Sequence, residues 1–223
     1  TRVTDQPLAG PARQLGLTLS PAHLEAFDRY SQALLAWNQK LNLTRITAPE
    51  EIITKHFLDS LSVYPVLAGF RPSLIALPAV RLTLLESTAK KTRFLQYIVA
   101  ALRLDNVTVL TARAEEAGQH PAHREQYDVA VARAVAALPV LAEYMLPLVK
   151  VNGLMVAQKG QNPAAEVAAA AGAIEMLGGT AARIQPVTLE PLAGQRHLVV
   201  IQKSKPAPTR YFRRPGMPAK KPL

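Results

Sequence analysis

Residues 80–203 predict an α/β fold, in which a mostly parallel sheet is covered by helices on both faces. Short apolar runs of strand length alternate in this region with amphipathic helical segments, and helices are the usual connections between parallel strands. A second observation is that polar residues directly follow several of these runs. The first seventy residues lack this alternation and predict helices instead.

Helical periodicity characterises residues 1–70, which we expect to form an N-terminal helical segment or cap. Apolar residues recur at helical spacing over Leu24–Leu35. They follow Ser20-Pro21, a capping residue and a proline suited to the first helical turn. Another helix is expected to begin near Pro49-Glu50-Glu51, because acidic side chains favour a helix N-terminus.

The apolar runs within residues 71–205 predict a succession of strands and helices in one main domain. The strands of the parallel sheet are expected at Arg81–Ser87, Asn106–Leu110, Asp128–Ala132 and Gly153–Gln158. Helices are expected at Lys90–Leu104 and Leu138–Leu148. Arg183–Val187 and His197–Lys203 predict a final antiparallel pair at the sheet edge.

The composition favours a single main domain with a polyanionic partner. A chain of 223 residues can bury one substantial core but is short for two full enzyme domains. Its formal net charge of +10 favours nucleic acid first and an anionic membrane surface second, because cations placed near phosphates release condensed counterions. The alternative that the basic charge serves only solubility stays open.

The residue types present also exclude several kinds of chemistry. The absence of cysteine excludes disulfides, zinc sites with thiolate ligands and cysteine nucleophiles. We expect no metal site. No apolar run has the length that spans a bilayer and no signal peptide is recognisable, so we expect a cytoplasmic protein with no membrane partner. A monomer is the expected state. Residues 206–223, rich in Pro, Arg and Lys, predict an extended or disordered basic tail that adds salt-dependent affinity for nucleic acid.

Polar residues directly follow four of the expected strands: Glu86, Ala114-Glu115, Arg133 and Lys159. The carboxyl ends of parallel strands share one edge of the sheet, where ligands bind in this class of fold. A carboxylate at such a position can accept both hydroxyls of a ribose. Each residue also has a structural alternative, as a helix cap or as one partner of an exposed ion pair.

Six segments carry a resemblance to a known family. They are WNQKLNLT (37–44), KHFLDSL (55–61), LLESTAKKTRFL (84–95), RAEE (113–116), ARA (132–134) and QRHLVVIQK (195–203). In this order and spacing they resemble the bacterial 16S ribosomal RNA guanine-N7 methyltransferases of the RsmG or GidB family. The likeness extends over nearly the whole chain, and RRPGMPAKKPL (213–223) resembles the ending of some members.

The resemblance implies a Rossmann-like fold dependent on S-adenosylmethionine, with an N-terminal helical segment and 16S ribosomal RNA of the small subunit as partner. Glu86 with Ser87 and Thr88 would meet the ribose, Ala114 and Glu115 would flank the adenine, and Arg133 would line the cofactor and catalytic pocket. Lys159, Arg196 and His197 match positions near the reaction site or the RNA-binding face. Lys90 and Lys91 would belong to a phosphate-binding face or simply to the exposed side of a helix.

The helical motifs contain further polar residues that match the family: Asn38, Asn42, Thr44, His56 and Asp59. For Asn42 and Thr44 a structural role in a turn and cap is favoured. His56 is equally consistent with a core histidine bonded to Asp59 and with a functional residue.

The sequence departs from the family pattern just before residue 80. Members begin their sheet with a strand that leads into a glycine-rich loop, which lets the cofactor approach the backbone closely. Only Leu74–Val80 separate the Gly69–Ser73 segment from the strand at Arg81, whereas a strand, a crossover helix and the next strand need about 30 residues. We expect that about twenty residues are missing from the sequence near positions 73–74, rather than that the protein lacks the loop.

Two other functions remain as alternatives. A nicotinamide-dependent oxidoreductase also uses an acid after its second strand, but it predicts a G-x-G-x-x-G loop that the sequence does not contain. A non-catalytic RNA-binding or ribosome-binding protein on a degenerate methyltransferase fold is favoured if the glycine-rich loop is truly absent.

Overall fold

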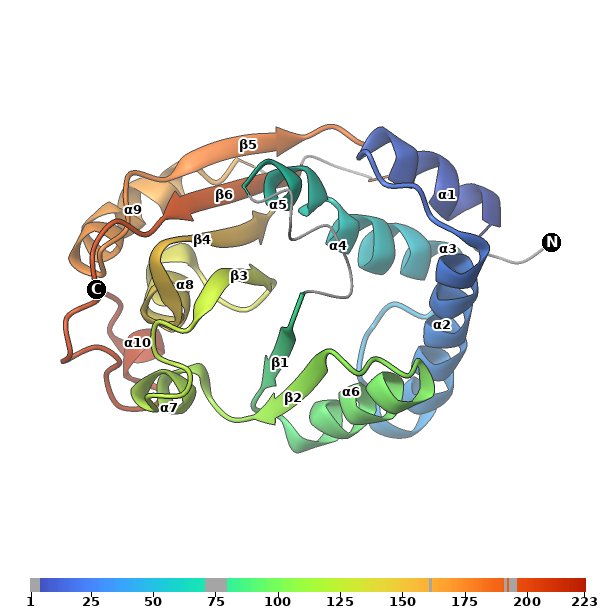
Figure 1. The fold of residues 1–223 in the computed structure, drawn as a ribbon, viewed down its shortest axis with the longest axis horizontal. Helices are drawn as coiled ribbons and strands as arrows, with labels where there is room; N and C mark the ends of the chain where they lie inside the picture. Colours follow the sequence, from blue (N-terminus) through green and yellow to red (C-terminus); the bar gives the residue numbers. More distant parts are fainter. Residues whose placement is uncertain (1–4, 71–79, 161, 191, 193–195) are drawn as a thin grey trace. The chain divides into compact units, whose positions relative to one another are not determined.

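The structure is a computed structural model that describes residues 5–70, 80–160, 162–190, 192 and 196–223 (Figure 1). Its chain forms two compact units. Unit 1 contains residues 1–111 and 189–193, and unit 2 contains residues 112–188 and 194–223. Among the described residues, no helix has both the length and the apolar character needed to cross a membrane.

Helices make up the N-terminal part of unit 1, as the periodicity predicted. They are α1 (Asp5–Gln14), α2 (Pro21–Leu41), α3 (Pro49–Glu51), the π-helical stretch η1 (Ile52–Leu58), α4 (Asp59–Leu61) and α5 (Tyr64–Phe70). The hydroxyl of Ser20 accepts a hydrogen bond from the His23 backbone at 3.3 Å, which fixes the start of α2. Phe27 and Tyr30 of α2 pack on Phe57 of η1, with ring centroids 4.8 and 5.6 Å apart.

The remainder of unit 1 is a β-α-β unit. Strands β1 (Leu82–Glu86) and β2 (Val107–Thr111) are parallel, and α6 (Ala89–Ala101) connects them. Their register runs from Leu82 opposite Val107 to Glu86 opposite Thr111. Both strands lie where the sequence placed them. The carboxyl ends of β1 and β2 therefore meet at one edge.

Unit 2 contains a four-stranded mixed sheet in the order β3-β4-β6-β5 (Figure 1). Its strands are β3 (Tyr127–Arg133), β4 (Val149–Lys159), β5 (Arg183–Val187) and β6 (Arg196–Gln202). Strands β3 and β4 are parallel, whereas β6 pairs antiparallel with both β4 and β5, which confirms the expected final pair. The helices of this unit are α7 (Ala114–Gln119), α8 (Leu138–Met145), the 3-10 turn η3 (Leu146–Leu148), α9 (Ala164–Met176) and α10 (Met217–Lys220).

The main hydrophobic core of unit 2 lies between its sheet and the helices α8 and α9. Met155 and Ala157 of β4 and Val199 and Ile201 of β6 are fully buried in it. The same cluster includes Leu138, Leu141, Ala142 and Met145 of α8 and Ala170 and Ile174 of α9. This burial explains why β4 and β6 read as continuous apolar runs in the sequence.

The C-terminal segment corrects one expectation. The sequence predicted that residues 206–223 are extended or disordered, but the segment packs against unit 2. Tyr211 and Phe212 are 7% and 4% exposed, and Tyr211 belongs to the main core cluster. Burial of each such aromatic side chain contributes about 1.5–3 kcal/mol, which outweighs the tendency of a Pro-rich basic sequence to remain disordered.

The sheet is also divided, where the sequence predicted one parallel sheet. Among the described residues, β1 pairs only with β2, and β3 pairs only with β4. The apolar side chains of these edge strands stay partly exposed, with Leu82 at 46% and Val131 at 44%. The junction at residues 73–74, where we expected a strand and a glycine-rich loop to be missing, lies outside the described residues.

Candidate functional site

Glu86 ends β1 at the carboxyl edge of the small parallel sheet in unit 1. One of its oxygens accepts a hydrogen bond from the Thr88 backbone at 2.8 Å, and the other lies 3.6 Å from the Lys91 ammonium. Thr88 is the residue that precedes α6, so the turn Ser87-Thr88 is held between the strand and the helix. The strand end, the turn and the first helical turn thus form one small polar constellation.

Partial burial by itself would raise the pKa of Glu86. Hydrogen bonds from Thr88, the charge of Lys91 and a hydrogen bond from the Ser87 backbone outweigh burial, so the pKa lies below its usual range. The carboxyl is therefore ionised at neutral pH. A carboxylate offers about four acceptor positions, so Glu86 retains capacity for the hydroxyls of a ribose.

Arg133 ends β3 in unit 2, at the carboxyl edge of the second sheet. Its partner in the parallel register is Gln158, so the ends of β3 and β4 lie side by side. The next residue, Ala134, has a φ of 55°, a left-handed conformation that a residue with a Cβ rarely adopts. The chain therefore turns sharply away from the sheet directly after Arg133, which is half-buried.

Lys159 ends β4 and is held by two partners in unit 2. Its ammonium donates to the Ala136 carbonyl at 2.9 Å and to the Glu166 carboxylate at 2.7 Å. The same Glu166 oxygen accepts from the Leu138 backbone at 2.9 Å. Burial alone would raise the pKa of Glu166, but these two donors and the charge of Lys159 hold it below its usual range. This junction fixes the loop that follows Arg133.

Sequence reasoning did not find Glu166. It lies in the first turn of α9, where an acid is expected to favour the helix N-terminus. The only signal available was its position seven residues after Lys159, and that spacing belongs to no regular element. The loop between the strand and the helix brings the two side chains together.

Arg196 and His197 begin β6, which runs antiparallel to β4. His197 therefore lies opposite Lys159 in the register, at the same edge of the sheet as the end of β3. The imidazole of His197 is 2.9 Å from the Gly160 carbonyl and so closes the end of β4. The structure thus gathers Arg133, Lys159, Arg196 and His197 at one edge of unit 2.

Ala114 and Glu115 begin α7, as their place after the second strand predicted. Glu115 is only 3% exposed, and its carboxylate accepts a hydrogen bond from the Gly216 backbone at 2.8 Å. Its side chain therefore anchors the C-terminal segment. The sequence could not show this contact, because the two residues are separated by 101 positions.

The two lysines of α6 differ in what they contact. Lys91 faces Glu86, as described above. The Lys90 ammonium donates to the Leu41 carbonyl at 2.9 Å and so ties α6 to the end of α2. Both side chains are exposed, so their location on the solvent-facing side of α6 agrees with the simpler of the two interpretations.

The polar residues of the helical motifs form a separate cluster in unit 1. Asn42 has a φ of 48° and caps the end of α2, and Asn38 accepts from the Thr44 backbone at 2.8 Å. The Thr44 hydroxyl is 3.2 Å from the His56 imidazole. These contacts connect the turn after α2 to η1, as expected for structural residues. Asp59 is 7% exposed at the start of α4.

The strand ends therefore carry two polar groups, one in each unit. Glu86 with its turn belongs to unit 1, whereas the cluster of Arg133 and Lys159 belongs to unit 2. Within the described parts of the chain, no group of three or more acidic or histidine side chains is placed to hold a metal ion. Parallel α/β strands that end in a carboxylate on one side and in basic residues on the other define the class of proteins that bind nucleotide-like ligands at strand ends.

Comparison with known proteins identifies the family within this class. Residues 23–199 match the family model of GidB, described as rRNA small subunit methyltransferase G. The chain therefore belongs to the GidB family of rRNA small subunit methyltransferases.

Two relatives, each named ribosomal RNA small subunit methyltransferase G, illustrate how far the likeness extends. The protein of Roseiflexus sp. (strain RS-1) is 47% identical and is matched over 97% of this chain and 98% of its own length. That of Moorella thermoacetica (strain ATCC 39073 / JCM 9320) is 40% identical over 100% of this chain and 99% of its own. Its alignment covers 238 positions although this chain has 223 residues, so the relative has residues at about 15 positions where this chain has none.

Similar folds occur among solved structures at low sequence identity. Cofactor-bound Rv0187 from MTB matches with a TM-score of 0.49 and 16% identity, over 84% of this chain and 100% of that one. The O-methyltransferase TomG from Streptomyces achromogenes, in complex with SAM, matches with a TM-score of 0.47 and 16% identity, over 81% of this chain and 90% of that one.

Proposed function

We propose that this chain is an enzyme that transfers a methyl group from S-adenosylmethionine to N7 of a guanine in 16S ribosomal RNA of the small ribosomal subunit. Membership of the GidB family over residues 23–199 is the observation that carries the proposal. It favours this function over a nicotinamide-dependent oxidoreductase. We further propose that the enzyme acts in the cytoplasm as a monomer, since its partner is the ribosomal RNA.

The residues at the strand ends fit the proposed cofactor. Glu86 is an ionised carboxylate with acceptor capacity to spare, which suits a ribose, and the turn Ser87-Thr88 lies directly beside it. Ala114 and the backbone of Glu115 would flank the adenine, since the Glu115 side chain is bonded to Gly216. Arg133 would orient the cofactor and the base, held in place by the loop that Lys159 and Glu166 fix.

The chemistry requires little acid-base assistance from the protein. S-adenosylmethionine, when bound, supplies an electrophilic methyl group on a positively charged sulfur. N7 of guanine has a free lone pair, so the base need not lose a proton before it attacks. The side chains have to align the two partners and exclude water. Arg196 and His197, on the same edge as Arg133, would face the RNA or the reaction site, and Lys90 and Lys91 would add phosphate contacts.

The Arg133→Ala variant tests this proposal on purified small ribosomal subunits with labelled methyl donor. Loss of a charged hydrogen-bond donor costs about 1.5–3 kcal/mol, so we expect turnover to fall about tenfold or more, while RNA affinity changes by about twofold at most. Arg183→Ala removes the same charge from the exposed face of β5 and serves as the control. Unchanged turnover in Arg133→Ala would remove this residue from the mechanism.

The wild-type protein distinguishes the proposal from its main rival. Methyl incorporation at a guanine N7, mapped on the recovered 16S RNA, is the expected result. RNA binding without any methyl incorporation or donor uptake would instead establish a non-catalytic RNA-binding protein on a degenerate methyltransferase fold.

A further inference from the structure

We infer that the C-terminal segment, residues 203–223, is a preorganised cationic surface that binds phosphates of the ribosomal RNA. The inference rests on the proposed function, because it takes that RNA as the partner. The segment contains seven Lys and Arg residues and no Asp or Glu. Its charge is therefore of one sign, in a stretch that packs on unit 2 rather than moving freely.

Two of the seven cations point inward and anchor the segment. The fully buried Lys203 ammonium donates to Glu125 at 2.6 Å and to the Leu146 carbonyl at 2.8 Å. The Arg213 guanidinium forms a two-pronged pair with Glu143, a fully buried residue of α8, at 2.5–3.1 Å. Such a bidentate pair fixes direction as well as distance. Its hydrogen bonds from Arg213 also raise the pKa of the guanidinium.

Backbone contacts hold the rest of the segment. Glu125 accepts from the Ala207 backbone and Glu115 from the Gly216 backbone, each at 2.8 Å. The Arg124 guanidinium donates to the carbonyls of Ala207, at 2.9 Å, and of Tyr211. Three acidic side chains and one arginine of unit 2 are therefore occupied in holding this segment.

Two glycines of unit 2 are shaped for the segment. A Cβ on Gly118 of α7 would lie 1.6 Å from the Phe212 ring, which itself is buried. A Cβ on Gly178, whose φ is 85°, would lie 2.1 Å from the Lys205 carbonyl oxygen. The sequence thus leaves space for the segment at two separate places, as expected for a built docking site.

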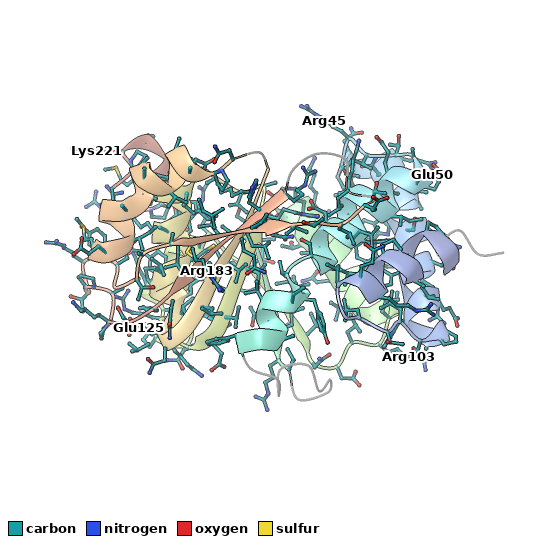
Figure 2. All side chains as sticks on the ribbon, turned by 90° about the horizontal axis from the view of Figure 1, so that it is seen from above. Arg45, Glu50, Arg103, Glu125, Arg183 and Lys221 are labelled. Atoms are coloured by element: carbon teal, nitrogen blue, oxygen red, sulfur yellow. The ribbon has the colours of Figure 1, made fainter. Side chains whose placement is uncertain are left out.

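The other five cations of the segment are exposed: Lys205, Arg210, Arg214, Lys220 and Lys221. In the described parts of the chain, none of the five forms an ion pair with a carboxylate. Figure 2 labels Lys221 at the surface of unit 2. Since Glu115 and Glu143 are buried beneath the segment and already bonded, they leave the outward charge largely uncompensated.

This arrangement fits RNA better than a membrane surface. Binding at a lipid interface needs large apolar side chains beside the cations, but Tyr211 and Phe212 are buried and only Met217, at 38%, is a large exposed apolar residue of the segment. A series of cations on a fixed backbone instead suits the repeated phosphates of a nucleic acid. Because the segment is already ordered, binding does not have to order it.

The double variant Arg210→Gln/Arg214→Gln tests the inference through the salt dependence of binding to purified small-subunit RNA. Each phosphate that the protein no longer neutralises lowers the slope of log K against log salt by about 0.7–0.9, so we expect the slope to fall by about 1–2. Arg13→Gln/Arg183→Gln removes two exposed cations elsewhere and should leave the slope nearly unchanged. Equal slopes for the wild type and the first variant, or equal decreases in both variants, would overturn the inference.

A second variant, Gly118→Ala, separates a fixed surface from a merely charged tail. It removes no cation, but its methyl group would displace Phe212. We expect trypsin to cleave more readily after Arg210 and Arg214, and RNA affinity to fall severalfold. Cleavage with unchanged affinity would refute preorganisation, and continued protection would contradict the packing on which it is built.

Controls distinguish failure of this inference from failure of the proposed function. Methyl transfer by the wild type tests the function alone, whereas the slopes test the segment whether or not methylation occurs. Vesicles of anionic phospholipid form a further arm. If these vesicles compete with RNA for the segment and the double variant loses only lipid binding, the surface is a membrane contact and the inference is wrong.

Discussion

Glu125 stabilises unit 2 by neutralising the buried ammonium of Lys203. Burial would raise the pKa of Glu125, but hydrogen bonds from Lys203 and the Ala207 backbone, together with the charges of Lys203 and Arg124, lower it. Burial also lowers the pKa of Lys203, although its bond to Glu125 opposes this. Removal of one partner of such a pair leaves an uncompensated charge in the interior.

We therefore expect Glu125→Gln to lower the free energy of unfolding by about 3 kcal/mol at pH 7. A carboxyl whose folded pKa is depressed stabilises the protein above its unfolded pKa, near 4.3, and loses that contribution as pH falls through the folded value. The wild type should thus lose stability between about pH 5 and 3, and the variant should lose less. Urea unfolding at pH 7, 5 and 3.5 measures this, and identical pH profiles would contradict it.

At the same scale, the sequence predicted which residues end the strands but not what each side chain contacts. Glu86 and Arg133 lie at strand ends as expected, because apolar runs followed by polar residues define such positions. The partners Glu166 of Lys159 and Gly216 of Glu115 depend on tertiary packing. No local pattern predicts contacts of that kind.

At the scale of elements, strand positions followed from apolar patterning, whereas the C-terminal segment did not. The pattern placed β1, β3 and β5 within one or two residues of their ends. Proline and basic residues in 206–223 are typical of disorder, and their number concealed the one aromatic pair, Tyr211-Phe212. That pair was the signal for packing, since two adjacent aromatic side chains are rarely left exposed in a tail.

Phe212→Ala tests whether the segment is part of the folded unit. Loss of a buried phenylalanine ring costs about 3–5 kcal/mol, so we expect a clearly lower unfolding midpoint in urea. Thr209→Ala, at an exposed position of the same segment, should change stability by about 0.5 kcal/mol or less. Similar midpoints for Phe212→Ala and the wild type would show that the segment does not contribute to the core.

At the scale of the whole molecule, the divided sheet agrees with the departure noted in the sequence. Strands β1 and β3 each pair on one side only within the described residues and keep apolar side chains partly exposed. Both features are expected if a strand is missing from the sequence near 73–74. The unmatched positions in the Moorella alignment support the same interpretation. The pattern of residues 80–203 could predict the α/β class, but not a division caused by absent residues.

Peptide mapping of the protein produced from its natural gene tests this interpretation. We expect the peptide that joins Phe70 to Arg81 to be heavier than the sequence allows, by about twenty residues that include a glycine-rich stretch. Segments elsewhere in the described chain serve as controls for the mapping. A peptide with the mass of residues as they stand would show that the protein lacks the loop, and would favour the non-catalytic alternative.

Calorimetric titration of the natural full-length protein with S-adenosylmethionine tests the central claim, that the strand ends hold this cofactor. We expect saturable binding at one site. Glu86→Gln should weaken it about tenfold or more, because hydrogen bonds to a charged group contribute about 1.5–3 kcal/mol. Glu50→Gln, an exposed acid in α3 (Figure 2), should not. The absence of donor uptake, even with the small ribosomal subunit present, would contradict the claim.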